Sequence, residues 1–293
     1  MAGMDISTEN RLNDMPNHIE ERDILSLLQW YMDSGVNETI DDLPQDWFEL
    51  SQSLTKKTAP KPPIPTGQSG IMSKKIASMV SIEHIAQDAA RLAASCDSLR
   101  ELNDVIKNFN GCSLKKIATH TVFSDGNPDS DIMMIGEAPG VDEDRHGKAF
   151  LGENGQMLDR MLKAIGLSRK NDFYLTNILP WRPPGNRKPL AEEITICLPF
   201  IKRHIELFNP KLLILLGGIS ANSLMNSDLG ITRLRGKWLE YELYGKTIPV
   251  RPLFHPAYLL KQPKAKADTW KDLLEIKAKI AEKTTRETGG KTE

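Results

Sequence analysis

The segment 131-DIMMIGEAPG-140 joins a short apolar run to a glycine-rich turn, and this pattern decides the fold class. Three further apolar runs follow along the chain: 173-FYLTNIL, 211-KLLILLGG and 248-IPVRPLF. Segments with helical periodicity stand between them, such as 155-GQMLDRMLKAIGL and 191-AEEITICLPFIKRHIELF. Apolar strands that alternate with helices are typical of a parallel sheet covered on both faces. The sequence therefore predicts an α/β protein.

Small, polar or histidine residues follow each of these apolar runs. GEAPG follows the first run, LPWRPPGNR the second, GGISAN the third and HPAYLL the fourth. Binding sites in parallel sheets form beyond the carboxyl ends of the strands. We therefore expect the functional site at that edge of the sheet.

The composition limits the classes of function. The 293 residues include 38 basic and 39 acidic side chains, so any DNA contact must come from a local basic patch. The chain has neither a signal-peptide core nor a run of about eighteen apolar residues, which disfavours secretion and membrane spanning and predicts a cytoplasmic protein. Three cysteines are too few, and odd in number, for a disulfide framework.

Shifts in composition divide the chain into four parts. Residues 1–50 are expected to form an appendage, in which 18–34 have the periodicity of one amphipathic helix. The Lys- and Pro-rich residues 51–75 predict a flexible linker. Residues 76–283 form the main domain, and 284–293 a disordered tail. We expect a monomer whose N-terminal helix docks on the body or binds a protein partner.

Two helices are expected to lead into the main domain. They lie over 82–109 and are separated by a turn near Cys96, after which Ser98 is a candidate N-cap. The first predicted strand follows them.

From the residues alone, the glycine-rich turn leaves alternatives open. GEAPG could bind an anion through its backbone amides or form a tight strand-to-helix connection, and it lacks the Gly-Lys-Ser/Thr ending of a nucleotide loop. Phe150 can stack on a base, Asn177 can pair with an amide edge, and His255 can reach a carbonyl oxygen. Taken singly, each of these has a structural explanation: loop packing, a strand-end turn, or a surface position before Pro256.

Three segments, in this order and spacing, resemble the uracil-DNA glycosylase superfamily: 136-GEAPGVDEDRHGKAFLGENG-155, 177-NILPWRPPGNRKP-189 and 255-HPAYLL-260. The resemblance extends from about Phe109 to Lys279 and is closest to the family 4 branch, which usually bears an iron–sulfur cluster. It implies a three-layer α/β/α sandwich around a central four-stranded parallel sheet, and the helix expected over residues 18–34 would be an N-terminal helical extension of this fold. It also implies a monofunctional glycosylase that removes uracil from DNA and starts base excision repair.

The resemblance assigns two catalytic residues. Glu137 would lie near the sugar, where its carboxylate positions or activates water and favours the developing positive charge. His255, as a neutral ring, would donate a hydrogen bond to uracil O2 as negative charge accumulates there.

The same resemblance implies four substrate-binding residues. Phe150 would stack on the flipped ring, and Asn177 would read the O4 and N3 edge, which discriminates against cytosine. Glu143 would block the thymine methyl group, although a carboxylate that caps a helix start remains the alternative for this residue. Ala138 would complete the pocket.

The expected DNA contacts lie on two loops. Arg182, Arg187 and Lys188 stand beside two prolines and would grip phosphates. The residues after His255 resemble the loop that enters the vacated base stack, and they are Tyr258, Leu259 and Leu260.

The cluster of the family 4 relatives is expected to be absent. The positions that match its four cysteines are Phe109, Cys112, Trp181 and Cys197, so two thiols remain where a [4Fe–4S] cluster requires four thiolates. We expect the two aromatic side chains to fill the site and the two cysteines to remain buried thiols; Cys96 as a substitute ligand is the alternative. No cofactor or metal is predicted.

Two other functions stay open at this point. The chain could be a glycosylase for another deaminated base, such as hypoxanthine. It could also be a non-catalytic module that binds DNA or uracil and is tied to a replication protein.

Overall fold

A computed structural model describes residues 69–243 and 245–289 of the chain. These residues belong to a compact unit that runs from Gln68 to Glu293. The predicted appendage, including its helix over 18–34, lies outside the described residues, as does most of the predicted linker. None of the helices in the described part is long and apolar enough to cross a membrane.

The centre of the unit is a six-stranded sheet with the order β1-β3-β2-β4-β6-β5. All four predicted apolar runs are strands, and they form the parallel centre of the sheet. They are β2 (Ile132–Gly136), β3 (Tyr174–Asn177), β4 (Leu212–Leu216) and β6 (Lys246–Leu253). The expected α/β class and its parallel four-stranded centre are therefore confirmed.

Two antiparallel edge strands extend this centre, β1 (Asp125–Gly126) beside β3 and β5 (Leu239–Leu243) beside β6. The sequence did not predict them, because β1 is very short and β5 alternates polar with apolar residues. Such alternation suits an edge strand with one solvated face, whereas a strand buried on both faces is a continuous apolar run.

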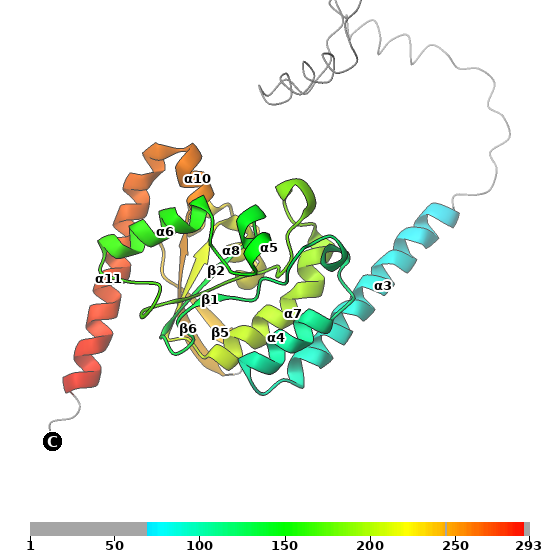
Figure 1. The fold of residues 1–293 in the computed structure, drawn as a ribbon, viewed down its shortest axis with the longest axis horizontal. Coiled ribbons are helices and arrows are strands. Elements are labelled where there is room, and N and C mark those ends of the chain that lie inside the picture. The colour runs from blue at the N-terminus through cyan, green and yellow to red at the C-terminus, as the bar shows by residue number, and fades with distance from the viewer. Residues whose placement is uncertain (1–68, 244, 290–293) are drawn as a thin grey trace, which may run out of the picture. The chain divides into compact units, whose positions relative to one another are not determined.

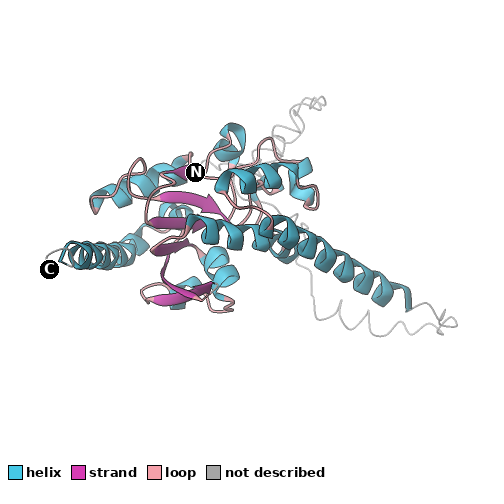
Figure 2. Cartoon of the chain, turned by 90° about the horizontal axis from the view of Figure 1, so that it is seen from below, coloured by secondary structure: helices cyan, strands magenta, loops and turns pink. Residues whose placement is uncertain are grey.

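The helices cover both faces of the sheet (Figures 1 and 2). The principal helices are α3 (Ser69–Ala94), α4 (Leu99–Asn108), α6 (Glu153–Ala164), α7 (Ala191–Phe208), α8 (Gly218–Met225) and α11 (Lys266–Gly289). Short helices fill the loops: α5 (Val141–His146), α9 (Ile231–Leu234) and α10 (Pro256–Lys261). Single 3-10 turns lie at Ser113–Lys116, Pro184–Asn186 and Pro263–Ala265.

Alternate residues along a strand point to opposite hydrophobic clusters. Met133 and Ile135 of β2 pack with residues of α3, α4, α7 and α8, whereas Ile132 and Met134 pack with residues of α6 and α11. A strand buried on both faces reads as a continuous apolar run because neither side of it meets water. This is the three-layer arrangement that the sequence predicts.

Two predicted boundaries differ from the structure. Helix α3 begins at Ser69, inside the predicted linker, and α11 continues to Gly289, inside the predicted tail. The segment 275-EIKAKIAEK-283 before the tail is rich in Lys, Glu and Ala, which are strong helix formers, and the helix continues from it into the tail. The expected break between two helices is confirmed, since the Ser98 side chain caps α4 by accepting from the Glu101 amide at 3.2 Å.

A buried ion pair fastens α11 to the sheet. Arg251 of β6 is fully buried and donates to Asp272 at 2.8 Å, and it lies 2.9 Å from Glu275. Arg235 contacts the other oxygen of Asp272 at 2.9 Å. Because Asp272 is itself buried, this carboxylate balances two guanidinium groups and ties α11 to β6 and to the segment after α9.

Candidate active site

Two neighbouring strands bring Glu137 and Asn177 together at the carboxyl edge of the sheet. Gly136 ends β2 and pairs in register with Asn177, the last residue of β3. The pairing continues past the strands, because the Ile178 and Leu179 amides donate to the carbonyls of Gly136 and Glu137 at 3.0 and 3.1 Å. The glycine-rich turn and the second loop are thus held side by side by backbone hydrogen bonds.

The Phe150 ring lies over Gly136. A Cβ atom at Gly136 would fall 2.5 Å from the ring and 2.5 Å from Asn177 Oδ1, so only glycine leaves room for both side chains. The ring is buried, and its centroid lies 5.9 Å from that of His255 with 34° between the planes. Phe150 has φ 53, a left-handed conformation that costs a non-glycine residue about 1–2 kcal/mol.

Asn177 carries an unpaired acceptor. Its side chain is buried, and Oδ1 has no hydrogen-bond partner among the described residues. A buried polar atom left in this way costs about 1–3 kcal/mol, and native proteins retain few of them. The free carbonyl is therefore suited to accept a hydrogen bond from a ligand that enters beside Phe150.

His255 is held as a neutral ring. It caps α10, where its Nδ1 accepts from the Ala257 amide at 3.2 Å, so the ring proton lies on Nε2. Burial lowers the pKa of His255 to about 4, well below neutral pH. The ring consequently carries its proton on Nε2, which is a hydrogen-bond donor, and has no charge.

Gly217, at the end of β4, completes the support of His255, and the sequence analysis did not single it out. Its φ is +96, and a Cβ there would lie 3.1 Å from the His255 Cβ. The Gly217 amide also donates to the Leu253 carbonyl at 2.9 Å. The double glycine in 211-KLLILLGG was the available signal, because close approach of two backbones favours glycine.

Glu137 is half-buried at the first position after β2. Burial raises the pKa of its carboxyl group, and the positive charge of Lys188 partly offsets that rise. A carboxylate with a raised pKa at a strand end is suited to accept a proton from water. Ala138 beside it is half-buried and packs against the core.

Glu143 makes the contacts of a helix-start carboxylate, the alternative left open by its sequence. Its Oε2 accepts from the Gly140 amide at 3.0 Å, and its Oε1 accepts from the Leu151 and Gly152 amides at 3.1 and 3.3 Å. The residue is also buried. The carboxylate therefore joins the start of α5 to the loop that follows Phe150.

Of the three predicted phosphate-binding cations, Arg187 is used within the protein. Its guanidinium group forms a two-point ion pair with the buried Glu193, at 2.6 and 2.9 Å, and so fixes the start of α7. Arg182 donates to Asn186 at 2.7 Å, and Lys188 is exposed. Arg182 and Lys188 are thus better suited than Arg187 to contact phosphate.

The predicted wedge residues differ in exposure. Tyr258 is 43% exposed and Leu260 is partly exposed, but Leu259 is fully buried in a small cluster with Met157 and Phe254. Leu259 is therefore a packing residue in this conformation, contrary to its predicted role. A helical turn points successive side chains in different directions, so α10 cannot expose all three.

The residues at the positions matched to cluster cysteines do not fit an iron–sulfur cluster. Cys112 and Cys197 are buried and share a hydrogen bond, which together with burial raises the pKa of Cys197 well above its usual value. Trp181 is buried and donates to Thr121 at 3.0 Å, and Phe109 packs edge-on against Phe200 at 5.0 Å. Two thiols and two packed aromatic side chains cannot supply four thiolate ligands.

Within residues 69–243 and 245–289, the third cysteine does not supply a missing ligand. The Cys96 thiol, just after α3, donates to the Leu92 carbonyl in the last turn of that helix at 3.2 Å. Among the described residues there is no group of three or more His, Cys, Asp or Glu side chains placed to hold a metal ion.

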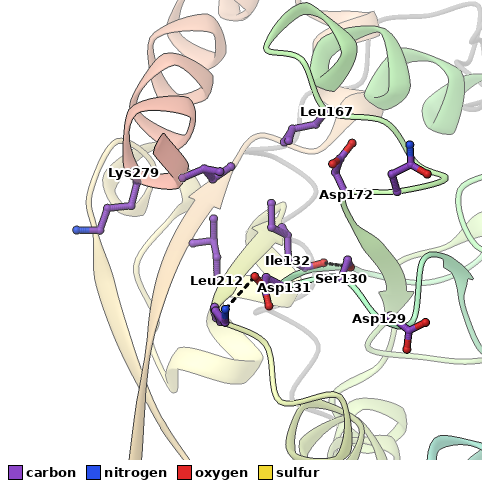
Figure 3. Close-up of a pocket in the computed structure, with 11 residues that line it drawn as sticks. Asp129, Ser130, Asp131, Ile132, Leu167, Asp172, Leu212 and Lys279 are labelled. Carbon is purple, nitrogen blue, oxygen red and sulfur yellow. Dashed lines mark hydrogen bonds and ion pairs between the residues drawn. The ribbon is translucent and has the colours of Figure 1, made fainter. Parts of the chain in front are cut away.

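A separate hollow of about 310 Å³ lies at the opposite edge of the sheet (Figure 3). It is lined by Ile132 and Leu212, which begin β2 and β4, and by acidic side chains that include Asp131 and Asp172. Asp131 is ion-paired with Lys211 at 3.2 Å. Because the polar strand ends of the candidate site lie at the carboxyl edge, this hollow is not part of it.

Comparisons with known proteins point to one family. The sequence model of the Uracil DNA glycosylase superfamily matches residues 123–274. The type-4 uracil-DNA glycosylase of Archaeoglobus fulgidus is 37% identical over 185 residues, which span 61% of this chain and 92% of that protein. The type-4 uracil-DNA glycosylase of Saccharolobus solfataricus is 38% identical over 192 residues, or 64% of this chain and 88% of that protein.

A viral protein of another kind is also similar. A DNA polymerase of Bacillus phage SP01 is 32% identical over 182 residues, which span 62% of this chain but 18% of the polymerase.

The residues matched by the superfamily model, 123–274, include the four site residues Glu137, Phe150, Asn177 and His255.

Proposed function

Because the chain belongs to the uracil-DNA glycosylase superfamily, we propose that it flips uracil out of DNA, hydrolyses the N-glycosidic bond and so starts base excision repair. The hydrolase class follows from the family. The observation that carries the proposal for this chain is the meeting of a buried aromatic ring, an unpaired amide oxygen and a neutral histidine at one edge of the sheet.

The recognition step rests on Asn177 and Phe150. Uracil presents an N3–H donor next to an O4 acceptor, so Asn177 Oδ1 would accept from N3 and its amide nitrogen would donate to O4. Cytosine presents an acceptor and a donor at these two positions and would leave both unpaired. The Phe150 ring would stack against the flipped base and hold it facing Asn177.

The bond-breaking step rests on His255 and Glu137. As the bond between the anomeric carbon and N1 breaks, its electron pair moves to uracil and charge gathers on O2. The neutral His255 ring would donate its Nε2–H to that oxygen and so stabilise the charge that develops on it. Glu137 would orient a water molecule toward the sugar cation and take up its proton. Attack by water, not by a side-chain amine, makes the reaction monofunctional.

We also propose that this chain works without the cluster of its family 4 relatives. The support is the packing of Phe109 and Trp181 beside the hydrogen-bonded Cys112 and Cys197. Apolar packing would replace the cross-links that a cluster supplies between the segments before β1 and after β3.

DNA binding would use the loops around the site. Arg182 and Lys188 would contact phosphates on one side, and Tyr258 and Leu260 would enter the space left by the flipped base. The monomeric state, the cytoplasmic location and a partner for the N-terminal segment stay predictions of the sequence.

The direct test is cleavage of a uracil-containing oligonucleotide with and without EDTA. We expect the wild type to leave alkali-labile abasic sites in both conditions. Glu137→Gln, Asn177→Ala and His255→Ala should each slow the reaction by orders of magnitude, whereas the exposed-residue control Glu153→Gln should not.

Two results would point to other functions. Activity on hypoxanthine but not on uracil in a substrate panel would indicate a different deaminated base. Binding without cleavage would indicate a non-catalytic module, which the similarity to a phage DNA polymerase makes a specific alternative.

A further inference from the structure

We propose that Arg169 is a positioning residue for the proposed base-stacking ring, and that it acts by holding the backbone of Phe150. This inference rests on the proposed function, since it concerns the same pocket. Arg169 lies in the loop between α6 and β3, distant in sequence from the glycine-rich turn and from the HPAYLL segment. Arg169 contacts the main chain of the Phe150 loop, and the proposal does not require it to touch the bound base.

The guanidinium group of Arg169 binds two consecutive carbonyls of the Phe150 loop. Nη1 donates to the Ala149 carbonyl at 3.0 Å, and Nη2 donates to the Phe150 carbonyl at 2.8 Å. A planar fork that engages two successive carbonyls fixes the orientation of both peptide groups. These are the peptides that set the left-handed conformation of Phe150.

Two carboxylates from different elements hold the same guanidinium group. Nε of Arg169 donates to Asp159 of α6 at 3.0 Å, and Nη1 donates to Asp125 of β1 at 2.9 Å. The Arg169 side chain is 19% exposed, so its position is fixed by protein contacts on several sides. A side chain restrained in this way can hold a loop in a conformation that the loop would not favour alone.

The first turn of α6 restrains the same carbonyl from another side. A Cβ at Gly155 would fall 1.7 Å from the Phe150 carbonyl oxygen, so α6 packs directly against this peptide. Arg169 and Gly155 therefore restrain one peptide, while the ring of that residue lies over Gly136. Loss of the arginine fork should let Phe150 relax out of the left-handed region and carry its ring away from Asn177.

The test measures inhibition by free uracil, single-turnover excision of uracil from DNA, and the melting temperature. Arg169→Gln should weaken inhibition by free uracil and slow excision, each by roughly tenfold, as expected for loss of most of a base-stacking contact. Arg169→Lys keeps the charge but cannot form the fork, so we expect an intermediate effect. The control is Arg160→Gln, because Arg160 is exposed and its Nη2 lies 3.9 Å from the Met157 sulfur, away from the Phe150 loop.

A double mutant separates positioning from general stability. If Arg169 acts through the ring, Arg169→Gln should change uracil inhibition by less than about twofold in a Phe150→Ala background, because the contact is already lost. The proposal would be overturned if Arg169→Gln weakened uracil inhibition by a further tenfold in the Phe150→Ala background. It would also be overturned if the single variant Arg169→Gln were inhibited by uracil as strongly as the wild type.

A crystal structure of Arg169→Gln distinguishes this inference from the proposed function. We expect Phe150 to leave the left-handed region in that structure, whatever base the pocket takes. If the wild-type protein neither excises nor binds uracil, the proposed function is wrong. The conformation of Phe150 in the Arg169→Gln structure would still show whether Arg169 holds the loop. An unchanged Phe150 conformation would refute the positioning role.

Discussion

Replacement of Asn177 by alanine should have opposite effects on activity and on stability. In the proposed complex, Asn177 makes two hydrogen bonds to uracil, and its loss leaves the N3 and O4 groups of the bound base unpaired. The loss of two hydrogen bonds, with the uracil groups left unpaired, should reduce the binding free energy of the base in the transition state by about 2–4 kcal/mol. At about 1.4 kcal/mol per factor of ten, kcat/KM should fall roughly 30- to 1,000-fold.

The free protein should tolerate the same change. The buried Oδ1 of Asn177 has no partner among the described residues, so its removal relieves a cost of about 1–3 kcal/mol. The small cavity left by the deleted atoms costs about 1 kcal/mol. The variant should therefore be between about 0 and 2 kcal/mol more stable than the wild type, whereas an average substitution destabilises by about 1 kcal/mol.

Urea unfolding and single-turnover excision measure the two effects on the same preparations. Asn171→Ala is the matched control, because Asn171 is exposed in the loop before β3, and it should change neither quantity appreciably. If Asn177→Ala loses more than about 1 kcal/mol of stability, the residue holds the fold and the argument from its unpaired oxygen is wrong. Activity within twofold of wild type would refute its role in reading the base.

Three further predictions concern proton transfer, packing and metal content. The excision rate should not change near pH 6.5, because His255 is already neutral there with a pKa of about 4. The rate should instead fall at acid pH, where Glu137, whose pKa is raised above 4.5, takes up a proton. Asp272→Ala should destabilise the protein by about 3–5 kcal/mol in urea unfolding, because it strips the buried Arg251 of its buried counter-charge; a loss below 1 kcal/mol would contradict this. Anaerobically purified protein should lack stoichiometric iron and visible cluster absorbance, and either signal would refute the apolar replacement of the cluster.

Much of the fold could be predicted from the sequence because the signals are local. A strand buried on both faces must be apolar at every position, so 211-KLLILLGG identified β4 without any tertiary contact. The cap at Ser98 is likewise a contact between near neighbours. The edge strand β5 was missed because its half-solvated pattern is not distinctive.

The candidate site was predictable where its residues lie at strand ends. Glu137 and His255 follow β2 and β6, and Asn177 ends β3. Parallel strands bring these carboxyl ends to one edge of the sheet. Which side chains are free to act was not predictable. Arg187 is committed to the buried Glu193, and Glu143 is committed to three backbone amides.

The sequence by itself determined the order of the four central strands, the family and the chemical groups of the site, because these depend on residue identity and short spacing. Only the tertiary structure decided that Leu259 is buried, that Asn177 keeps an unpaired oxygen, and that Arg169 reaches the Phe150 loop. Burial and hydrogen bonding depend on partners far along the chain, such as Met157 for Leu259. Packing in three dimensions determines these partners, and they cannot be predicted from the local sequence pattern.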